Sequence, residues 1–232
     1  MNSPFIYQAD INNKLTGNSM AIILMPDIFG ITDYAMATMQ EFAKVLQKPV
    51  YMFDYFYTLT GATNKFSPEE IDEAVSLMQK MRGEDFVPAF NKAVDAIRQE
   101  NPSIKQICVI GFCFAGCLAY LTGTEQAVTK IVSFYGAGAH TPDYYQAQTP
   151  IEVLVNARKN DPTLKVLSFY GTQDESIPEE DRDKTKQELK SANVSYLAKE
   201  YSAGHAYFQP GRPNYNESAA SSSWQDLKDF IN

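Results

Sequence analysis

Three side chains that could carry out nucleophilic chemistry follow separate apolar runs of this sequence. Cys113 follows the run QICVI, Asp174 follows KVLSFYG, and His205 comes shortly after VSYLAKEY. A thiol, an imidazole and a carboxylate form a complete set of nucleophile, base and orienting acid. If the fold brings the three together, the sequence predicts covalent catalysis by a cysteine.

The stretch around Cys113 has the spacing of a nucleophile elbow, a tight turn between a strand and a helix. Gly111 and Ala115 lie two residues to either side of Cys113, which gives G-x-C-x-A in place of the common G-x-S-x-G. A helix over 115–126 would place its N-terminal N–H groups near the sulfur and favour a thiolate. We expect Cys113 to be the nucleophile and the Phe114 N–H to bind an oxyanion; the alternative is a buried structural cysteine.

Asp174 and His205 follow the nucleophile in the chain order that α/β-hydrolases use, each in a loop after a later strand. Taken alone, Asp174 could be a turn residue and His205 an ordinary loop histidine. His140, the only other histidine, precedes Asp174 and so has the wrong order. The joint pattern predicts Cys113, Asp174 and His205 as the catalytic residues.

Short apolar runs alternate with segments of helical spacing along the chain. The runs are continuous, as in strands covered on both faces, at 20–25, 50–54, 106–111, 130–136, 165–171 and 194–201. Helical spacing appears in 33–48, 85–100 and the last segment. This alternation predicts an α/β fold with a largely parallel, doubly wound central sheet and helices on both faces. Together with the elbow and the chain order of Cys113, Asp174 and His205, it indicates the α/β-hydrolase fold. We expect one domain over 1–232.

Composition excludes several classes of function. The net charge is -8 and the lysines are scattered among acids, so we expect no nucleic-acid partner. The longest apolar runs are far shorter than the roughly 20 residues of a membrane span. The amino-terminal stretch through Lys14 carries one positive charge without an apolar core, so we expect no export signal. Three cysteines do not make a disulfide scaffold, which favours a cytoplasmic location.

The other two cysteines allow alternatives to hydrolysis. Cys108 lies inside an apolar run and is expected in the core. Cys117 lies four residues after Cys113, so the two could form a thiol switch or offer two sulfurs to a metal. No His or Asp cluster nearby completes a tetrahedral site, and we expect no metal.

The motifs together resemble those of the dienelactone hydrolase family. The family's elbow is G-x-C-x-G-G, and Gly111–Gly116 (GFCFAG) matches it except at Ala115. Its acid lies in a G-x-x-D loop, as in Gly171–Asp174, and its histidine in an H-x-F segment, similar to His205–Tyr207. Pro26–Gly30 (PDIFG) has the shape of the family's early loop. The resemblance runs from about residue 20 to the C-terminus.

This resemblance implies a carboxylic ester or lactone hydrolase that forms a covalent acyl-enzyme and needs no cofactor. It implies that the Ile28 N–H joins that of Phe114 in the oxyanion hole. It also implies that Asp27 stands where the family has a glutamate that helps to ionise the nucleophile; the alternative is that Asp27 caps the helix near 32–48.

The resemblance also indicates substrate-binding residues. Gln209 lies where the family has an arginine for the substrate carboxylate, with Arg212 beyond it, and either Arg82 or Lys65 could supply a second cation. Tyr207, with other aromatic residues, suggests a less polar acyl or alcohol group; the alternative is that these aromatic side chains pack within a loop. We expect a small-molecule ester or lactone as partner and a monomer or small homo-oligomer. The alternative is a noncatalytic or weakly active binding protein on the same fold.

Overall fold

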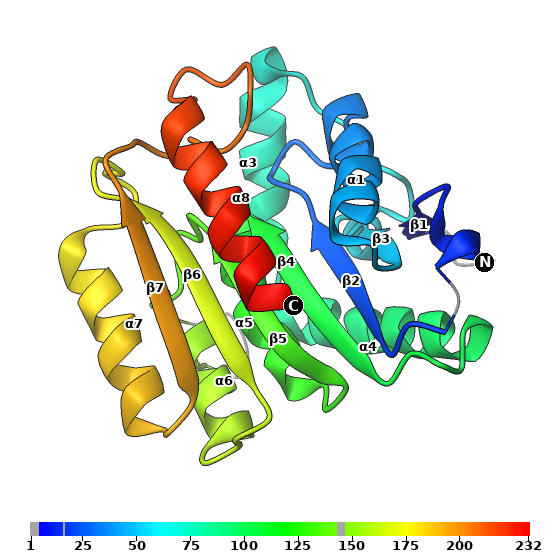
Figure 1. The fold of residues 1–232 in the computed structure, drawn as a ribbon. Coiled ribbons are helices and arrows are strands. Elements are labelled where there is room, and N and C mark those ends of the chain that lie inside the picture. Colours follow the sequence, from blue (N-terminus) through cyan, green and yellow to red (C-terminus); the bar gives the residue numbers. More distant parts are fainter. Residues whose placement is uncertain (1–4, 16, 143–146) are drawn as a thin grey trace.

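The structure is a computed structural model that describes residues 5–15, 17–142 and 147–232. Its strands form one sheet in the order β1-β3-β2-β4-β5-β6-β7 (Figure 1). The strands are β1 (Ile6–Gln8), β2 (Met20–Met25), β3 (Val50–Phe53), β4 (Gln106–Phe112), β5 (Val128–Phe134), β6 (Lys165–Gly171) and β7 (Ser195–Tyr201). Only β1 is antiparallel to its neighbour, so the carboxyl ends of the other six strands share one edge of the sheet.

Helices cover both faces of this sheet. They are α1 (Asp33–Leu46), α2 (Tyr57–Thr60), α3 (Ile71–Lys80), α4 (Gly83–Glu100), α5 (Phe114–Leu121), α6 (Pro150–Arg158), α7 (Glu179–Ser191) and α8 (Glu217–Ile231). Helices α1 and α8 pack on one face, where their apolar side chains share a core with the sheet (Figure 1). Helices α4, α5, α6 and α7 contribute to the core on the other face. The expected α/β-hydrolase architecture is confirmed.

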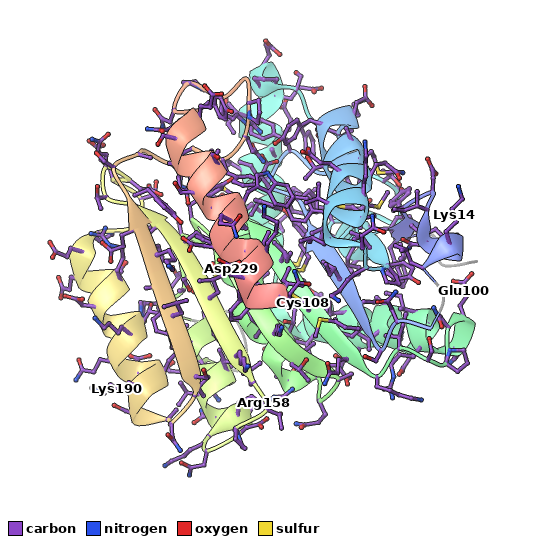
Figure 2. The ribbon with its side chains drawn as sticks, in the orientation of Figure 1. Lys14, Glu100, Cys108, Arg158, Lys190 and Asp229 are labelled. Atoms are coloured by element: carbon purple, nitrogen blue, oxygen red, sulfur yellow. The ribbon has the colours of Figure 1, made fainter. Side chains whose placement is uncertain are left out.

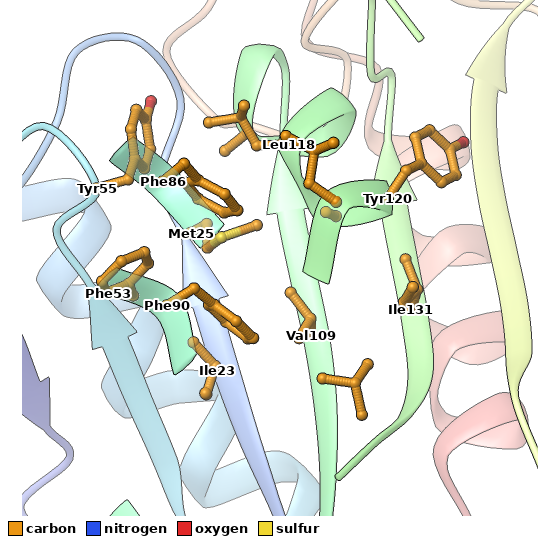
Figure 3. Close-up of a cluster of buried hydrophobic side chains, with 14 of the residues drawn as sticks. Ile23, Met25, Phe53, Tyr55, Phe86, Phe90, Val109, Leu118, Tyr120 and Ile131 are labelled. Carbon is orange, nitrogen blue, oxygen red and sulfur yellow. The ribbon is translucent and has the colours of Figure 1, made fainter. Parts of the chain in front are cut away.

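Alternate residues of the central strands feed the two cores. In β2, Ile23 faces the layer of α4 and α5 and lies near Phe90 and Val109 (Figure 3). Its neighbours Ile22 and Leu24 face the layer of α1. Because both faces are covered, β2 is buried along its whole length, which is why its sequence reads as a continuous apolar run.

Three details differ from the sequence-based expectation. The edge strand β1 was not expected, because it is three residues long and antiparallel. Helix α4 begins at Gly83, ahead of the predicted start, and contains Pro88 near its first turns, where few backbone hydrogen bonds are lost. The helix predicted over 115–126 ends as α5 at Leu121 and continues as a short 3₁₀ turn.

Arg158 lies near the edge of the sheet opposite to the carboxyl ends of the parallel strands (Figure 2). Its side chain is buried and donates hydrogen bonds to the carbonyl oxygens of Gly123, Glu125 and Val128. It also pairs with Asp161, with Nη1 and Oδ2 2.6 Å apart. The guanidinium thus ties the end of α6 to the segment that leads into β5.

Within the described ranges, every helix is too short or too polar to cross a bilayer. The sequence-based expectation of no export signal rests partly on residues 1–4, which lie outside the described residues.

Candidate active site

Cys113 occupies a sharp turn between β4 and α5. Its backbone has φ 56° and ψ -124°, a conformation that a residue with a side chain adopts only when its surroundings enforce it. The Cys113 N–H donates to the Phe134 carbonyl on β5 (3.0 Å), and the Cys113 carbonyl accepts from the Gly116 N–H (2.8 Å). These bonds hold the turn and place the sulfur at the carboxyl edge of the sheet.

Two glycines allow the backbone to make this turn. A Cβ on Gly111 would lie 2.1 Å from the Ala115 carbonyl oxygen, and a Cβ on Gly116 would lie 2.9 Å from the Cα of Gly136. Both positions therefore require glycine. Ala115, where the family pattern has glycine, is fully buried in the core on the α4 and α5 face. Its methyl group packs there without preventing the turn.

The structure brings Cys113, His205 and Asp174 into one hydrogen-bonded row. His205 Nε2 lies 3.1 Å from Cys113 Sγ, and His205 Nδ1 donates to Asp174 Oδ2 over 2.7 Å. Asp174 and His205 come from the loops after β6 and β7, as the chain order predicts. The arrangement can remove a proton from the thiol and hold the resulting imidazolium against a carboxylate.

Close packing of the two loops fixes this row. A Cβ on Gly171, at the end of β6, would lie 2.3 Å from the Ala203 carbonyl oxygen, so glycine lets the loops touch. Asp174 is buried, and its second oxygen, Oδ1, accepts from the Ser176 N–H (2.9 Å). With both of its oxygens bonded, the carboxylate has one orientation toward His205.

The environment of His205 favours its protonated form. Burial lowers the pKa of His205, but the hydrogen bonds to Asp174 and Cys113, together with their charges, outweigh burial and raise the pKa to about 10. Cys117, by contrast, is fully buried on α5, and burial raises the pKa of its thiol. A thiol of this kind is a poor redox partner, which counts against a switch with Cys113.

Asp27 lies in the loop after β2 and is held by three neighbours. Its Oδ1 accepts from the Phe29 N–H (3.0 Å), and its Oδ2 lies 2.6 Å from Arg212 Nη2. Its carbonyl oxygen accepts from the Tyr55 hydroxyl (2.9 Å). Among the hydrogen bonds of the described residues, Cys113 Sγ contacts His205 and not Asp27. The activating role of Asp27 stays a prediction.

Ile28 and Phe114, the expected oxyanion-hole residues, lie in the loop after β2 and at the start of α5. Ile28 is buried between Asp27 and Phe29, and Phe114 is the first residue of α5, directly after the nucleophile. Their roles stay predictions.

A cleft of about 530 Å³ opens over Cys113 and His205. Phe114, Met81 and Arg82 are among the residues that line it. Arg82, from the turn between α3 and α4, is exposed, and its Nη1 donates to the carbonyl oxygens of its own turn. Of the predicted substrate-binding residues, Arg82 reaches the cleft.

The other two predicted substrate-binding residues lie elsewhere. Tyr207 is fully buried beneath α8, with its hydroxyl 2.8 Å from that of Ser223, so it packs in the core and does not line the cleft. Gln209 is buried and accepts from Arg212 Nε (2.9 Å), beside a different cavity. These two predictions are corrected: the chain turns after His205 and directs both side chains inward.

Sequence reasoning missed Tyr135, which follows β5. Its backbone has φ 40°, and its ring packs edge-on against the His205 imidazole with centroids 5.2 Å apart. Its position at the end of a central strand was the signal that could have identified it. His140, the competing base, instead lies 2.9 Å from the Thr185 hydroxyl on α7 and does not contact Cys113.

Comparisons with known proteins show what the chain is similar to. The model of the dienelactone hydrolase family matches residues 9–232. A Synechocystis protein named "Putative carboxymethylenebutenolidase" is 28% identical over 218 residues, which cover 93% of this chain and 86% of that protein. The carboxymethylenebutenolidase of Rhodococcus opacus is 26% identical and covers 93% and 82%.

A solved structure shows the same fold. A dienelactone hydrolase-like promiscuous phosphotriesterase from metagenomic libraries superposes with a TM-score of 0.71 at 18% identity and covers 97% of this chain and 96% of its own. The family model spans nearly all of the chain and includes the segments that carry Cys113, Asp174 and His205. The chain therefore belongs to the dienelactone hydrolase family, a family of ester and lactone hydrolases.

Proposed function

We propose that the chain hydrolyses a carboxylic ester or lactone through a covalent acyl-enzyme on Cys113. One observation carries the proposal: His205 lies between the sulfur and a buried carboxylate, 3.1 Å from Cys113 Sγ and 2.7 Å from Asp174 Oδ2. A buried structural cysteine would not need a strained backbone or an oriented imidazole.

The steps follow from these contacts. His205 Nε2 takes the thiol proton, and the Cys113 sulfur attacks the carbonyl carbon of the substrate. The N–H groups of Ile28 and Phe114 stabilise the oxyanion that forms. The protonated imidazole then gives its proton to the leaving alkoxide, and an acyl group remains on the sulfur. A water molecule, deprotonated by His205, releases the acid and restores the thiol.

The cleft supports a small substrate that carries a negative charge. Apolar side chains such as Phe114 and Met81 form much of its lining, and Arg82 supplies the exposed cation. The relative from Rhodococcus opacus is a carboxymethylenebutenolidase, a name that denotes a lactone bearing a carboxylate group. We propose that Arg82 holds such a carboxylate. Arg82→Gln should raise KM for an anionic ester several-fold and leave KM for a neutral ester of the same size unchanged; equal changes for both would refute this role.

The nucleophile is tested by replacing Cys113 with alanine. Turnover of p-nitrophenyl acetate should fall to the background rate in Cys113→Ala, and mass spectrometry of the wild type during turnover should locate an acetyl group on Cys113. Cys117→Ala is the matched control, because Cys117 lies one helical turn away outside the cleft and should be dispensable for turnover. Full activity of Cys113→Ala, or acetylation elsewhere, would exclude the proposed mechanism.

A further inference from the structure

A second cavity, of about 240 Å³, lies beside the loop after β2. It is separate from the cleft over Cys113: neither Cys113 nor His205 lines it, and the two cavities have no lining residue in common. Its wall includes α1 and the segment 209–212. The proposed hydrolysis makes no use of this cavity.

The deep wall of this cavity is apolar. Leu24, Met52 and Phe112 lie near the ends of three neighbouring strands and belong to the core on the α1 face. Ala35 of α1 closes the cavity from the helix side. A dry apolar cavity of roughly 150 Å³ is enough to bind benzene, and this cavity is larger and opens to solvent on one side. A single ring with one or two substituents therefore fits the space.

The charges at the cavity favour an uncharged occupant. Asp27 and Arg212 both line it, and they neutralise each other across 2.6 Å. A charged ligand would have to lose water against a neutral, largely apolar wall, which is unfavourable. The Arg212 guanidinium carbon also lies over the Phe29 ring, 4.2 Å from its centroid, and this cation–π contact helps to hold the side chain in place.

Arg212 can still bind one polar atom of a ligand. Its Nε donates to Gln209 and its Nη2 to Asp27. Within the described residues, no hydrogen bond uses its Nη1, so the N–H groups there are available to an acceptor. A hydroxyl or carbonyl oxygen at the edge of a small ring could accept this bond while the ring contacts Leu24 and Met52.

We propose that this cavity binds a small uncharged molecule with one ring and one hydroxyl or carbonyl oxygen, such as a phenol or a cyclic ketone. The ring fills the space between the strand ends and Ala35, and the oxygen accepts a hydrogen bond from Arg212. This binding goes beyond the proposed hydrolysis and depends neither on Cys113 nor on turnover.

Methionine methyl groups allow a direct test, because different methionines line the second cavity and the catalytic cleft. Met52 lines the second cavity, whereas Met78 and Met81 line the catalytic cleft. Protein labelled with ¹³C at the methionine methyl groups would be titrated with phenol and followed by NMR. We expect the Met52 signal to shift with saturation while Met78 and Met81 stay unmoved, both before and after Cys113 is alkylated with iodoacetamide. Shifts confined to Met78 and Met81, or no saturable shift at all, would overturn the proposal.

Two alanines on α1 provide matched variants. Ala35 lines the cavity and is buried, whereas Ala37 is exposed on the same helix. Ala35→Leu should fill the space and weaken phenol binding at least tenfold, and Ala37→Leu should leave binding unchanged. If Ala35→Leu fails to fold, Thr38→Leu fills the cavity from the next turn. Unchanged affinity in a folded cavity-filling variant, or tighter binding of benzoate than of phenol, would refute the assignment.

Discussion

Asp174→Asn removes the charge that orients His205 and changes little else in shape. The carboxylate is buried and bonded to His205 Nδ1 and to the Ser176 N–H. In the wild type, the pKa of His205 rises from 6.5 to about 10. At about 1.4 kcal/mol per pKa unit, this is roughly 5 kcal/mol in favour of the imidazolium. Asp174 makes one of the two hydrogen bonds responsible, so about half, ~2–3 kcal/mol, should be lost.

The sign of the effect on stability follows from the direction of this pKa change. A histidine whose pKa is higher in the folded state stabilises the fold below its unfolded pKa of about 6.5. That contribution is lost as the pH rises through the folded pKa of about 10. The variant should therefore be less stable than the wild type at pH 6, and the part of the difference due to His205 should disappear above pH 10.

Three measurements check this reasoning. NMR of ¹⁵N-labelled histidine should show His205 titrating at lower pH in the variant; His140 is the only other histidine, and burial lowers its pKa, so the signals remain distinct. Urea unfolding at pH 6 and pH 10.5 gives the two stabilities. Ester turnover should fall by roughly 10³–10⁴-fold, as in serine triads. The exposed neighbour Glu175→Gln is the control. An unchanged His205 titration, or turnover within threefold of wild type, would refute the argument.

Two further substitutions test the turn at Gly111 and the buried carboxyl group of Asp54. Gly111→Ala should lower the free energy of unfolding by about 3 kcal/mol or more, because the new Cβ would lie 2.1 Å from a carbonyl oxygen. The control, Gly61→Ala, is at an open position with φ 67° and should lower the free energy of unfolding by only about 1 kcal/mol. Urea unfolding measures both, and equal losses of stability would contradict the predicted clash. Burial raises the pKa of Asp54 to about 6, and its Oδ2 has no hydrogen-bond partner within the described residues. Because the folded protein holds this proton more tightly than the unfolded chain does, the wild type should lose stability as the pH rises from about 4 to above 6. Asp54→Asn should remove this dependence and be more stable at pH 8 by up to about 3 kcal/mol; a wild type whose stability is flat over that range would exclude the idea.

Much of the fold could be predicted from the sequence because the sheet is covered on both sides. The parallel strands β2 to β6 are largely buried, so each appears as a continuous apolar run, whereas the parallel edge strand β7 is only partly buried. The edge strand β1 has three residues and one neighbour, and so little local signal distinguishes it from a loop. Helix α4 could be found but its start could not, because Pro88 is as compatible with the first turn as with the end of a preceding loop.

The proximity of Cys113, Asp174 and His205 was predictable because the carboxyl ends of parallel strands meet at one edge. The surroundings were not predictable, because they depend on side-chain direction and on distant pairs. Tyr207 is two residues from His205 and yet lies beneath α8, since the chain turns at Ala206 with φ 62°. The Asp27–Arg212 pair joins residues 185 positions apart, which no local pattern reveals.

The row of Cys113, His205 and Asp174 also makes activity a stringent reporter of complete folding. His205 is 92 residues from Cys113 and 31 from Asp174, so the row closes two long loops and cannot form until β4, β6 and β7 have paired within the sheet. Such nonlocal contacts form late, because chain entropy opposes them until the sheet exists. Helical content can return early in refolding without catalysis. Recovered turnover therefore measures the fraction of chains whose last strands have docked.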